Sequence, residues 1–379
     1  MKIGIVIRRF HTRGGTERRT HELVRWLLAA GHQIHLFAEE WDSPLADQLT
    51  CHRIHTVKLM RWLKALSFAM LAARATRRVK LDLIHSQART YADDVATLGG
   101  GCHADYLDRF VEDMSPFKQF WERHHPFNRV TLALEAAQYR RCRRIILNSH
   151  LAKAGLVKYF PWAEEKCRVV HNGIDPDFFK PDPQLRRELR TKLNLTDNRV
   201  VYLFVGSGFE RKGLPEFMRA LAVVKQRQPS CSILGLVVGN GNFPIYRALA
   251  KELDIEQEIH FAGAASDTRA YYCVADVFVL PTRFDPYANT TNEALASGLP
   301  VITTRTNGGH EVLTPQEGCV INHTGDVEAL AGAMGALLDE PCRHAMSLNA
   351  RELALRHSWR ETAQKTLAVY QEILSEQEK

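Results

Sequence analysis

Residues 200–217 read VVYLFVGSGFERKGLPEF, and this stretch decides the fold of the second half of the chain. The apolar run up to Val205 predicts a short buried strand. The glycines at positions 206 and 208 predict a tight turn, after which a helical pattern begins. A strand, a glycine turn and a helix in this order form the repeating unit of a doubly wound α/β domain with a parallel sheet.

The same unit recurs along the whole chain. The N-terminus begins with an apolar strand, KIGIVI (2–7), a loop that contains Gly14 and Gly15, and a helix that ends at Gly31. Short strands that alternate with helices pair in parallel through right-handed crossovers. Further strands are predicted at 33–39, 52–57, 81–86, 95–98, 144–148, 232–239, 258–263, 276–282, 300–304 and 319–323. The pattern predicts two doubly wound α/β domains that face each other across a cleft.

The length of 379 residues suits two domains better than one core. The Pro/Asp-rich stretch NGIDPDFFKPDP (172–183) is typical of a linker. We therefore expect an N-terminal domain of residues 1–166 and a C-terminal domain of residues 167–359. The eight cysteines form no C-x-x-C pair and no zinc-type cluster, which favours reduced, buried thiols.

The basic charge is concentrated in the first half of the chain. Residues 1–166 contain 27 Lys and Arg against 17 Asp and Glu, which is a net charge of +10. The whole chain has a net charge of +7, so residues 167–379 are slightly acidic. This excess predicts an acidic partner for the first domain. Only five uncharged residues precede Arg8 and Arg9, too few for the apolar part of a signal peptide. We expect a cytosolic protein.

Two adjacent cations, Arg211 and Lys212, follow the glycine turn and precede a helix. Such a pair at the carboxyl end of a strand can hold a diphosphate. The pattern is neither a Walker loop nor G-x-G-x-x-G, which argues against ATPases and NAD enzymes. A surface loop with two solvated cations is the structural alternative.

A second candidate site lies in FDPYANTTNEALASG (284–298). Asn289 can cap the helix that follows, and the amides near Thr290 favour phosphate. Asp285 and Glu293 can accept hydrogen bonds from the hydroxyls of two sugars on either side of a diphosphate. Alternatively, Glu293 supports the helix and Asp285 closes a turn.

Together, GFERKGL (208–214), VGNG (238–241), FDPYANTTNEALASGLPVI (284–302) and NGID (172–175) resemble glycosyltransferase family 4. The resemblance covers the whole chain, and it is strongest to lipopolysaccharide core glucosyltransferases that use UDP-glucose. It implies the GT-B fold, retaining chemistry and a last helix, about residues 360–379, that returns to the first domain. One departure is Asp285, which stands where the E-x7-E motif of the family has its first glutamate; its shorter side chain bears on how the donor sugar is held.

The resemblance also assigns roles to residues. Arg211 and Lys212 would bind the donor diphosphate beside Gly206, and Glu293 would bind the ribose. Asp285 and the amides near it would hold the transferred sugar, and Thr290 would contact a phosphate. The amides in question belong to Tyr287, Ala288 and Asn289. In the first domain, Gly14 and Gly15 match the glycine loop near the β-phosphate and the acceptor.

The segment GGGCHADYLDRF (99–110) matches the region that faces the sugar. His103 and its neighbour Asp105 are candidate catalytic residues there, whereas a His packed at a loop end is the structural alternative. The D-x-D sequence at Asp175 to Asp177 lies in the linker and predicts a turn rather than a metal site. Fixed cations and amides can stabilise a departing diphosphate without a metal or another cofactor. Because no nucleophile stands out in the first domain, we expect same-face displacement.

Two basic segments with aromatic residues, 57–80 and 106–144, are where we expect an acidic partner to bind. Basic amphipathic helices can lie peripherally on an anionic inner membrane leaflet; core helices with a solvated basic face are the alternative. No nucleic-acid recognition module is evident. Two other functions stay open: a nucleotide-sugar epimerase or hydrolase on the same fold, and a non-catalytic nucleotide-sugar sensor at the membrane.

Overall fold

The computed structural model describes residues 1–12, 14–112 and 114–377. The chain divides into two compact units, Met1–Gly173 with Trp359–Lys379, and Ile174–Ser358. Among the described residues, no helix is long and apolar enough to cross a membrane.

The first unit is built on a seven-stranded parallel sheet with the strand order β5-β3-β1-β6-β7-β8-β9. Its strands are β1 (Lys2–Val6), β3 (Gln33–Ala38), β5 (Thr50–Arg53), β6 (Leu83–Ser86), β7 (Val95–Leu98), β8 (Arg144–Leu147) and β9 (Cys167–Val169). The register of the centre places Ile5 opposite Leu36 on β3 and His85 on β6. Two very short strands, β2 (Arg9–Phe10) and β4 (Glu40–Trp41), form a separate parallel pair.

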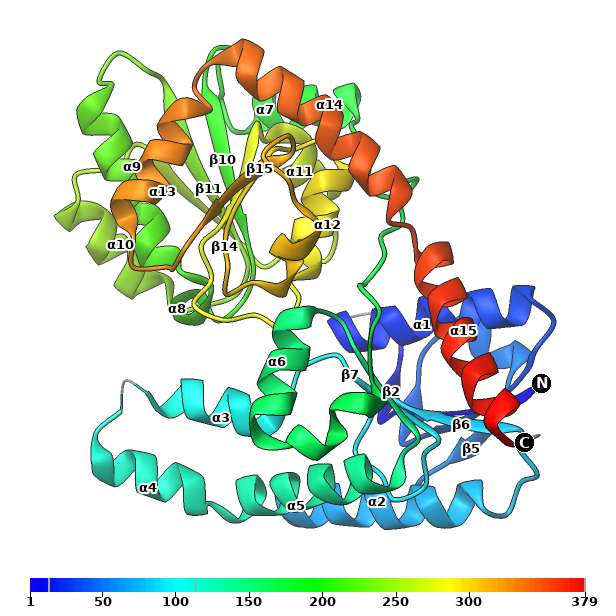
Figure 1. Ribbon diagram of the computed structural model, residues 1–379. Helices are drawn as coiled ribbons and strands as arrows, with labels where there is room; N and C mark the ends of the chain where they lie inside the picture. Colours follow the sequence, from blue (N-terminus) through cyan, green and yellow to red (C-terminus); the bar gives the residue numbers. More distant parts are fainter. Residues whose placement is uncertain (13, 113, 378–379) are drawn as a thin grey trace. The chain divides into compact units, whose positions relative to one another are not determined.

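Alternation along β1 divides the core of this unit into two layers. Ile3 and Ile5 pack with α1 (Gly15–Ala29) and α15 (Trp359–Gln377). Val6 points to the other face and packs with α2 (Arg61–Thr76). Figure 1 shows α1 and α15 lying side by side, and α2 next to α5 (Pro126–Arg141). Helices on both faces are what a buried parallel sheet requires.

The C-terminal helix α15 is part of the first unit. Its Tyr370 is fully buried, and the hydroxyl lies 2.5 Å from Nδ1 of His85 on β6. Farther along, Glu372 pairs with Arg144 on β8 and Arg168 on β9. The last helix therefore joins the N-terminal residues in one core.

The boundary of the first unit differs from the predicted one. Residues Cys167–Val169 form β9, which pairs with β8 at the edge of the first sheet. The boundary therefore lies at Gly173 and not at residue 166. Three residues of edge strand carried too weak a pattern to be recognised in the sequence.

The second unit has a six-stranded parallel sheet with the order β12-β11-β10-β13-β14-β15. Its strands are β10 (Val200–Val205), β11 (Ile233–Val238), β12 (Ile259–Gly263), β13 (Val277–Leu280), β14 (Val301–Thr304) and β15 (Gly318–Ile321). Tyr202 on β10 points to one face, where its hydroxyl donates to the carbonyl of Met334. Phe278 on β13 points to the other face and packs near Tyr272. The two faces of this sheet are therefore both buried.

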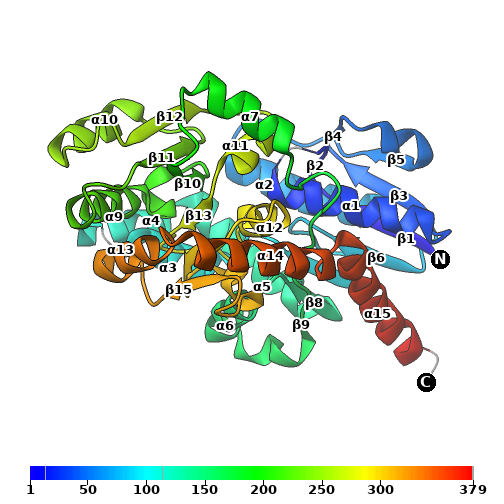
Figure 2. The same ribbon diagram turned by 90° about the horizontal axis from the view of Figure 1, so that it is seen from above.

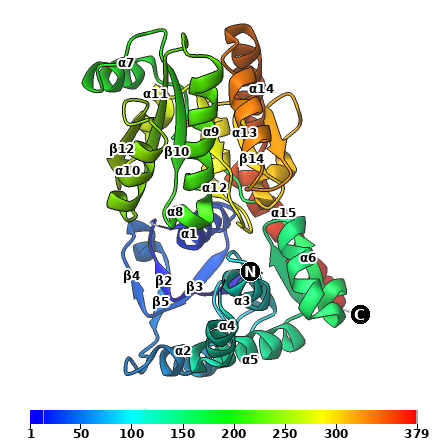
Figure 3. The same cartoon turned by 90° about the vertical axis from the view of Figure 1, so that its left-hand side faces the viewer.

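Helices α9 (Leu214–Arg227) and α13 (Val327–Ala336) lie side by side on the Tyr202 face (Figures 2 and 3). The remaining helices are α3 (His103–Val111), α4 (Pro116–His124), α6 (His150–Tyr159), α7 (Pro183–Lys192), α8 (Phe209–Lys212), α10 (Phe243–Glu252), α11 (Arg269–Val274), α12 (Asn289–Ala296) and α14 (Glu340–Arg356). Two parallel sheets with helices on both faces confirm the predicted α/β class with two Rossmann-like domains.

Candidate active site

In the second unit, α8 and the loop that follows β13 bring two cations against a carboxylate. Nζ of Lys212 lies 2.5 Å from Oδ2 of Asp285, and a guanidinium nitrogen of Arg211 lies 3.2 Å from the same oxygen. Arg211 also donates to the carbonyl of Phe284 at 2.7 Å. The structure thus brings the adjacent pair Arg211 and Lys212 together with Asp285, a predicted catalytic residue more than 70 positions away in the sequence.

Backbone contacts explain how α8 reaches this loop. The carbonyl of Arg211 accepts a hydrogen bond from the amide of Arg283 at 2.8 Å and another from the hydroxyl of Thr282 at 3.0 Å. Gly213 follows with φ of 81°, and a Cβ at this position would lie 2.0 Å from the carbonyl oxygen of Pro281. Only glycine permits that approach without strain. The GFERKGL motif therefore fixes its cations against the strand end.

Burial and charge act in opposite directions on Asp285. Burial by itself would raise the pKa of its carboxyl group, but the charges of Lys212 and Arg211 outweigh burial and lower this pKa below its ordinary value. Lys212 is itself only 8% exposed. A buried lysine and carboxylate stabilise each other, and removing one partner leaves the other charge uncompensated.

The start of α12 differs from the prediction. The N-cap residue is Ala288, no side chain caps the helix, and Asn289 is its first helical residue. The loop is held instead by Asn307, which is fully buried. Its Oδ1 accepts hydrogen bonds from the amides of Ala288 and Gly309, and its Nδ2 donates to the hydroxyl of Thr291.

Sequence reasoning missed Asn307 because it lies in a different loop, after β14. The only signal was its place in NGG (307–309), three positions after the end of a buried strand. An Asn before two glycines at a strand end is typical of a turn residue. Its role in fixing α12 depends on the pairing of β13 with β14, which no local pattern reveals.

Two of the three amides assigned to the sugar are already used within the loop. The amide of Tyr287 donates to Oδ1 of Asp285 at 3.1 Å, and that of Ala288 donates to Asn307. Asp285 therefore closes a turn, as the structural alternative predicted, and it also binds the two cations. The side chain of Tyr287 is buried, and its hydroxyl lies 3.1 Å from Oδ1 of Asn292. Tyr287 and Ala288 thus stabilise the loop itself.

Thr290 presents a different kind of polar group. Its hydroxyl is buried, and it has no hydrogen-bond partner among the described residues. It belongs to the first turn of α12, where the helix dipole favours an anion. The arrangement suits the predicted phosphate contact.

Glu293 lies one turn farther along α12 and is partly exposed. One of its carboxylate oxygens accepts a hydrogen bond from the buried hydroxyl of Tyr272 at 2.8 Å. This contact orients the carboxylate. Gly206 follows β10 and lies against the side chain of Lys212. A Cβ atom at position 206 would lie 3.4 Å from Cγ of Lys212.

In the first unit, Gly14 and Gly15 form the start of α1, and Gly14 has φ of 89°. His103 is the first residue of α3. Its amide donates to both oxygens of the buried Glu135, and its Nε2 lies 3.0 Å from Oδ1 of Asn128. Burial is the main reason that the pKa of His103 is lowered. A neutral imidazole is the form that these surroundings favour.

Asp105 occupies a structural position. It is 3% exposed, pairs with Arg109 at 3.0 Å, and packs so closely on Gly155 of α6 that a Cβ there would lie 2.6 Å from its Oδ2. The hollow lined by His103 does not include it. The reason is helical geometry, since residues two positions apart in α3 point in different directions. This placement favours an ion pair within α3 and packing against α6 over substrate contact.

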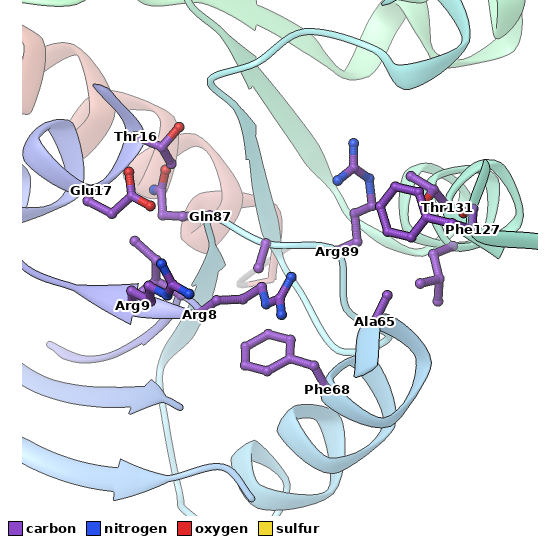
Figure 4. A pocket seen from close by; sticks show the side chains of 13 residues that line it. Arg8, Arg9, Thr16, Glu17, Ala65, Phe68, Gln87, Arg89, Phe127 and Thr131 are labelled. Atoms are coloured by element: carbon purple, nitrogen blue, oxygen red, sulfur yellow. Dashed lines mark hydrogen bonds between the residues drawn. The ribbon is translucent and has the colours of Figure 1, made fainter. Parts of the chain in front are cut away.

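Two adjoining hollows open at the carboxyl ends of β1, β6 and β7. The first, of about 250 Å³, is shown in Figure 4, where Arg8, Arg9 and Arg89 lie on its wall with Glu17 and Gln87. The second, of about 260 Å³, is lined by Gly99, Gly100, Gly101, His103 and Tyr106. In parallel α/β sheets, ligands bind at this edge.

The linker aspartate Asp175 confirms the predicted turn. Its Oδ1 accepts hydrogen bonds from the amides of Asp177 and Phe178 at 3.1 and 3.0 Å. Among the described residues, no group of three or more His, Cys, Asp or Glu side chains is placed to hold a metal ion.

Comparison with known proteins identifies the class. The family model for Glycosyl transferases group 1 matches residues 199–340, and the model for Glycosyltransferase Family 4 matches residues 13–178. With its two Rossmann-like units, the chain is a glycosyltransferase of the GT-B type. It belongs to glycosyltransferase family 4.

Individual relatives agree with this class. The lipopolysaccharide glucosyltransferase WaaG of Escherichia coli (strain K12) is 24% identical over 367 residues, which cover 93% of this chain and 94% of WaaG. The crystal structure of WaaG has a TM-score of 0.80 at 20% identity and covers 96% of this chain and 98% of that one. HepE of Anabaena in complex with UDP and glucose has a TM-score of 0.70 at 20% identity, covering 97% and 98%. These two structures show that the fold is shared.

Proposed function

We propose that this enzyme transfers glucose from UDP-glucose, with retention, to a saccharide acceptor of the lipopolysaccharide core or another lipid-linked glycan. The main support for a donor site is the cation pair Arg211 and Lys212, which contacts Asp285. The unpartnered hydroxyl of Thr290 at the start of α12 is a second anion-binding group. The choice of UDP and glucose follows WaaG, by its name a glucosyltransferase, and HepE, solved with UDP and glucose.

In the proposed reaction, the diphosphate binds Lys212 and Arg211, and the hydroxyl of Thr290 donates to a phosphate oxygen. The bond between the anomeric carbon and the β-phosphate oxygen breaks, and the acceptor oxygen forms its bond on the same face of the sugar. The acceptor proton passes to the departing phosphate oxygen. Negative charge grows on the diphosphate in this step, and preorganised cations stabilise it best. The residues in place supply that charge, and we propose that no metal is required.

The test is Lys212→Ala with UDP-glucose and a lipopolysaccharide core acceptor. We expect kcat to fall about 100- to 1,000-fold, the loss typical of one charge-stabilising group. Turnover is measured as UDP release coupled to glycosylated product. Lys192→Ala, which removes an exposed lysine of α7, is the matched control and should keep full activity. If Lys212→Ala changes only KM, Lys212 does not act in the transition state.

The two alternative functions are separated by incubation without an acceptor. An epimerase or hydrolase would convert UDP-glucose rapidly when it is alone, and a sensor would bind it without turnover on any acceptor. We expect slow hydrolysis alone and fast consumption once an acceptor is added. A thermal-shift series with UDP-, GDP- and ADP-sugars identifies the donor, because a ligand that binds only the folded form raises the melting temperature.

We further propose peripheral contact with an anionic membrane through α4. Phe117, Phe120 and Trp121 on this helix are 78%, 61% and 63% exposed. They lie beside the exposed cations Lys118 and Arg123. Aromatic side chains with neighbouring cations are typical of helices that lie in a membrane interface.

The other segment that we predicted to contact a membrane, residues 57–80, is less exposed in the structure than α4. Of the large apolar side chains in α2, Phe68 is buried in the core, whereas Met70 and Leu71 are 57% and 38% exposed. Trp62, Leu63 and Leu66 are half-buried. Because α2 packs against the sheet, its apolar stripe belongs to the core. The membrane contact proposed here therefore rests on α4 alone.

A further inference from the structure

A third hollow continues the pair at the carboxyl edge of the first sheet. It has a volume of about 310 Å³ and lies beside the ends of β3 and β5. Arg9 lines both this outer hollow and the middle one of Figure 4. The middle hollow in turn shares Thr16, Gln87 and Arg89 with the inner one beside His103. The three hollows therefore adjoin one another along the sheet edge and form a track.

The walls of this track carry more positive than negative side chains. The cations are Arg8, Arg9, Arg53, Lys58, Lys64 and Arg89, and the carboxylates are Glu17, Glu39 and Glu40. A cleft with one dominant sign of charge attracts ligands of the opposite sign.

The cations fall into two groups. In the first group, Arg8 and Lys64 share Glu39 at 3.1 and 2.7 Å, and Arg9 pairs with Glu40 at 2.8 Å. Glu39 is therefore already saturated by cations. Arg89 also belongs to this group, since it pairs with Glu135 at 2.7 Å.

Arg53 and Lys58, at the outer end of the track, have no carboxylate partner among the described residues. Arg53 is held in place by its stacking on Trp41, with its guanidinium carbon 4.9 Å from the ring centroid. Stacking restricts the side chain in advance and leaves the edge of the guanidinium available to an anion.

We propose that the acceptor is an acidic saccharide of two or more sugar units, and that Arg53 and Lys58 bind its phosphate or carboxylate in the outer hollow. This inference rests on the proposed glycosyl transfer. The middle hollow, with Arg8 and Arg89, takes the next unit. The inner hollow, beside Gly99 and His103, takes the unit whose hydroxyl is glycosylated. Arg53 and Lys58 thus determine specificity and take no part in the bond-making step.

The test measures binding of defined probes to the full chain by saturation-transfer NMR. The probes are trehalose 6-phosphate, a hyaluronan disaccharide as the carboxylate, and trehalose as the neutral sugar. We expect at least one acidic probe to bind about tenfold more tightly than trehalose, and the two acidic arms distinguish phosphate from carboxylate. In Arg53→Gln/Lys58→Gln this preference should disappear, while the Kd of UDP-glucose stays unchanged.

Arg77→Gln/Lys80→Gln is the matched control, since it removes two exposed cations of the same unit away from the track and should keep the preference. Equal binding of acidic and neutral probes overturns the proposal, as does a preference that survives in Arg53→Gln/Lys58→Gln. Binding of UDP-glucose is measured separately on the same samples. Its absence would count against the proposed glycosyl transfer, and its presence without acid preference would count against the acidic acceptor alone.

Discussion

Asp285 illustrates how one side chain can serve two functions at the scale of a residue. In the family motif this position holds a glutamate assigned to the donor sugar, whereas here the shorter aspartate binds Lys212 and Arg211. The single negative charge of Asp285 is shared by the two cations and leaves a net positive charge at the loop. Its lowered pKa means that the stabilisation from this pairing is present above about pH 4, the unfolded value, and is lost as pH falls through the folded value.

We therefore predict that Asp285→Asn lowers the free energy of unfolding by about 3 kcal/mol, because Lys212 is left buried without a counter-charge. UDP should then raise the melting temperature of the variant more than that of the wild type, since a diphosphate replaces the missing carboxylate. Thermal shift with and without UDP measures this difference. If the stability of Asp285→Asn is unchanged, Asp285 does not hold the cations in solution. Only its proposed contact with the donor sugar would then remain.

At the scale of an element, α15 is attached to the first sheet by a buried histidine. His85 is fully enclosed, and its ring lies within hydrogen-bond distance of Tyr370, Thr97 and Gln87. Burial, with a smaller effect of the Arg19 charge, lowers the pKa of His85 to about 3. The folded state therefore holds this ring neutral at pH values where the unfolded chain protonates it.

The consequence is a stability that decreases as pH falls from 6.5 toward 3. Between pH 6.5 and pH 5, His85 should contribute a loss of about 2 kcal/mol in the free energy of unfolding. His85→Gln cannot titrate, so its stability should depend less steeply on pH over that range. Tryptophan fluorescence in urea is a suitable measurement, because all six tryptophans belong to the first unit. Parallel pH profiles of the two proteins would contradict the burial of a neutral His85.

At the scale of the whole molecule, the first unit combines a basic surface with the aromatic side chains of α4. We predict that the protein co-sediments with vesicles containing anionic lipid and much less with neutral vesicles, since charge attraction and aromatic insertion act together. Phe117→Ser/Trp121→Ser should abolish the binding. Ile245→Ser/Leu348→Ser removes two equally exposed apolar residues of the second unit and should have no effect. Equal binding to both kinds of vesicle would contradict the proposal.

Much of the fold could be predicted because its signals are local. The apolar runs at 2–7 and 200–206 became β1 and β10, and the glycines after them mark the turns into helices. The GFERKGL motif (208–214) likewise predicted a pair of neighbouring cations. Asp105 shows the limit of such reasoning, since its place beside His103 in the sequence says nothing of which helix face it occupies.

The order of apolar strands, glycine turns and helices determined two α/β domains, because strand and helix periodicity act over a few neighbouring positions. The motifs around Arg211 and Asp285 predicted a candidate donor site. The tertiary structure alone decided which groups meet. Lys212 reaches Asp285, Asn307 holds α12, and Arg53 and Lys58 come to line one track with Arg9. These contacts depend on the order of the strands in each sheet. That order is set by long-range packing of buried faces, for which a single sequence carries no local signal.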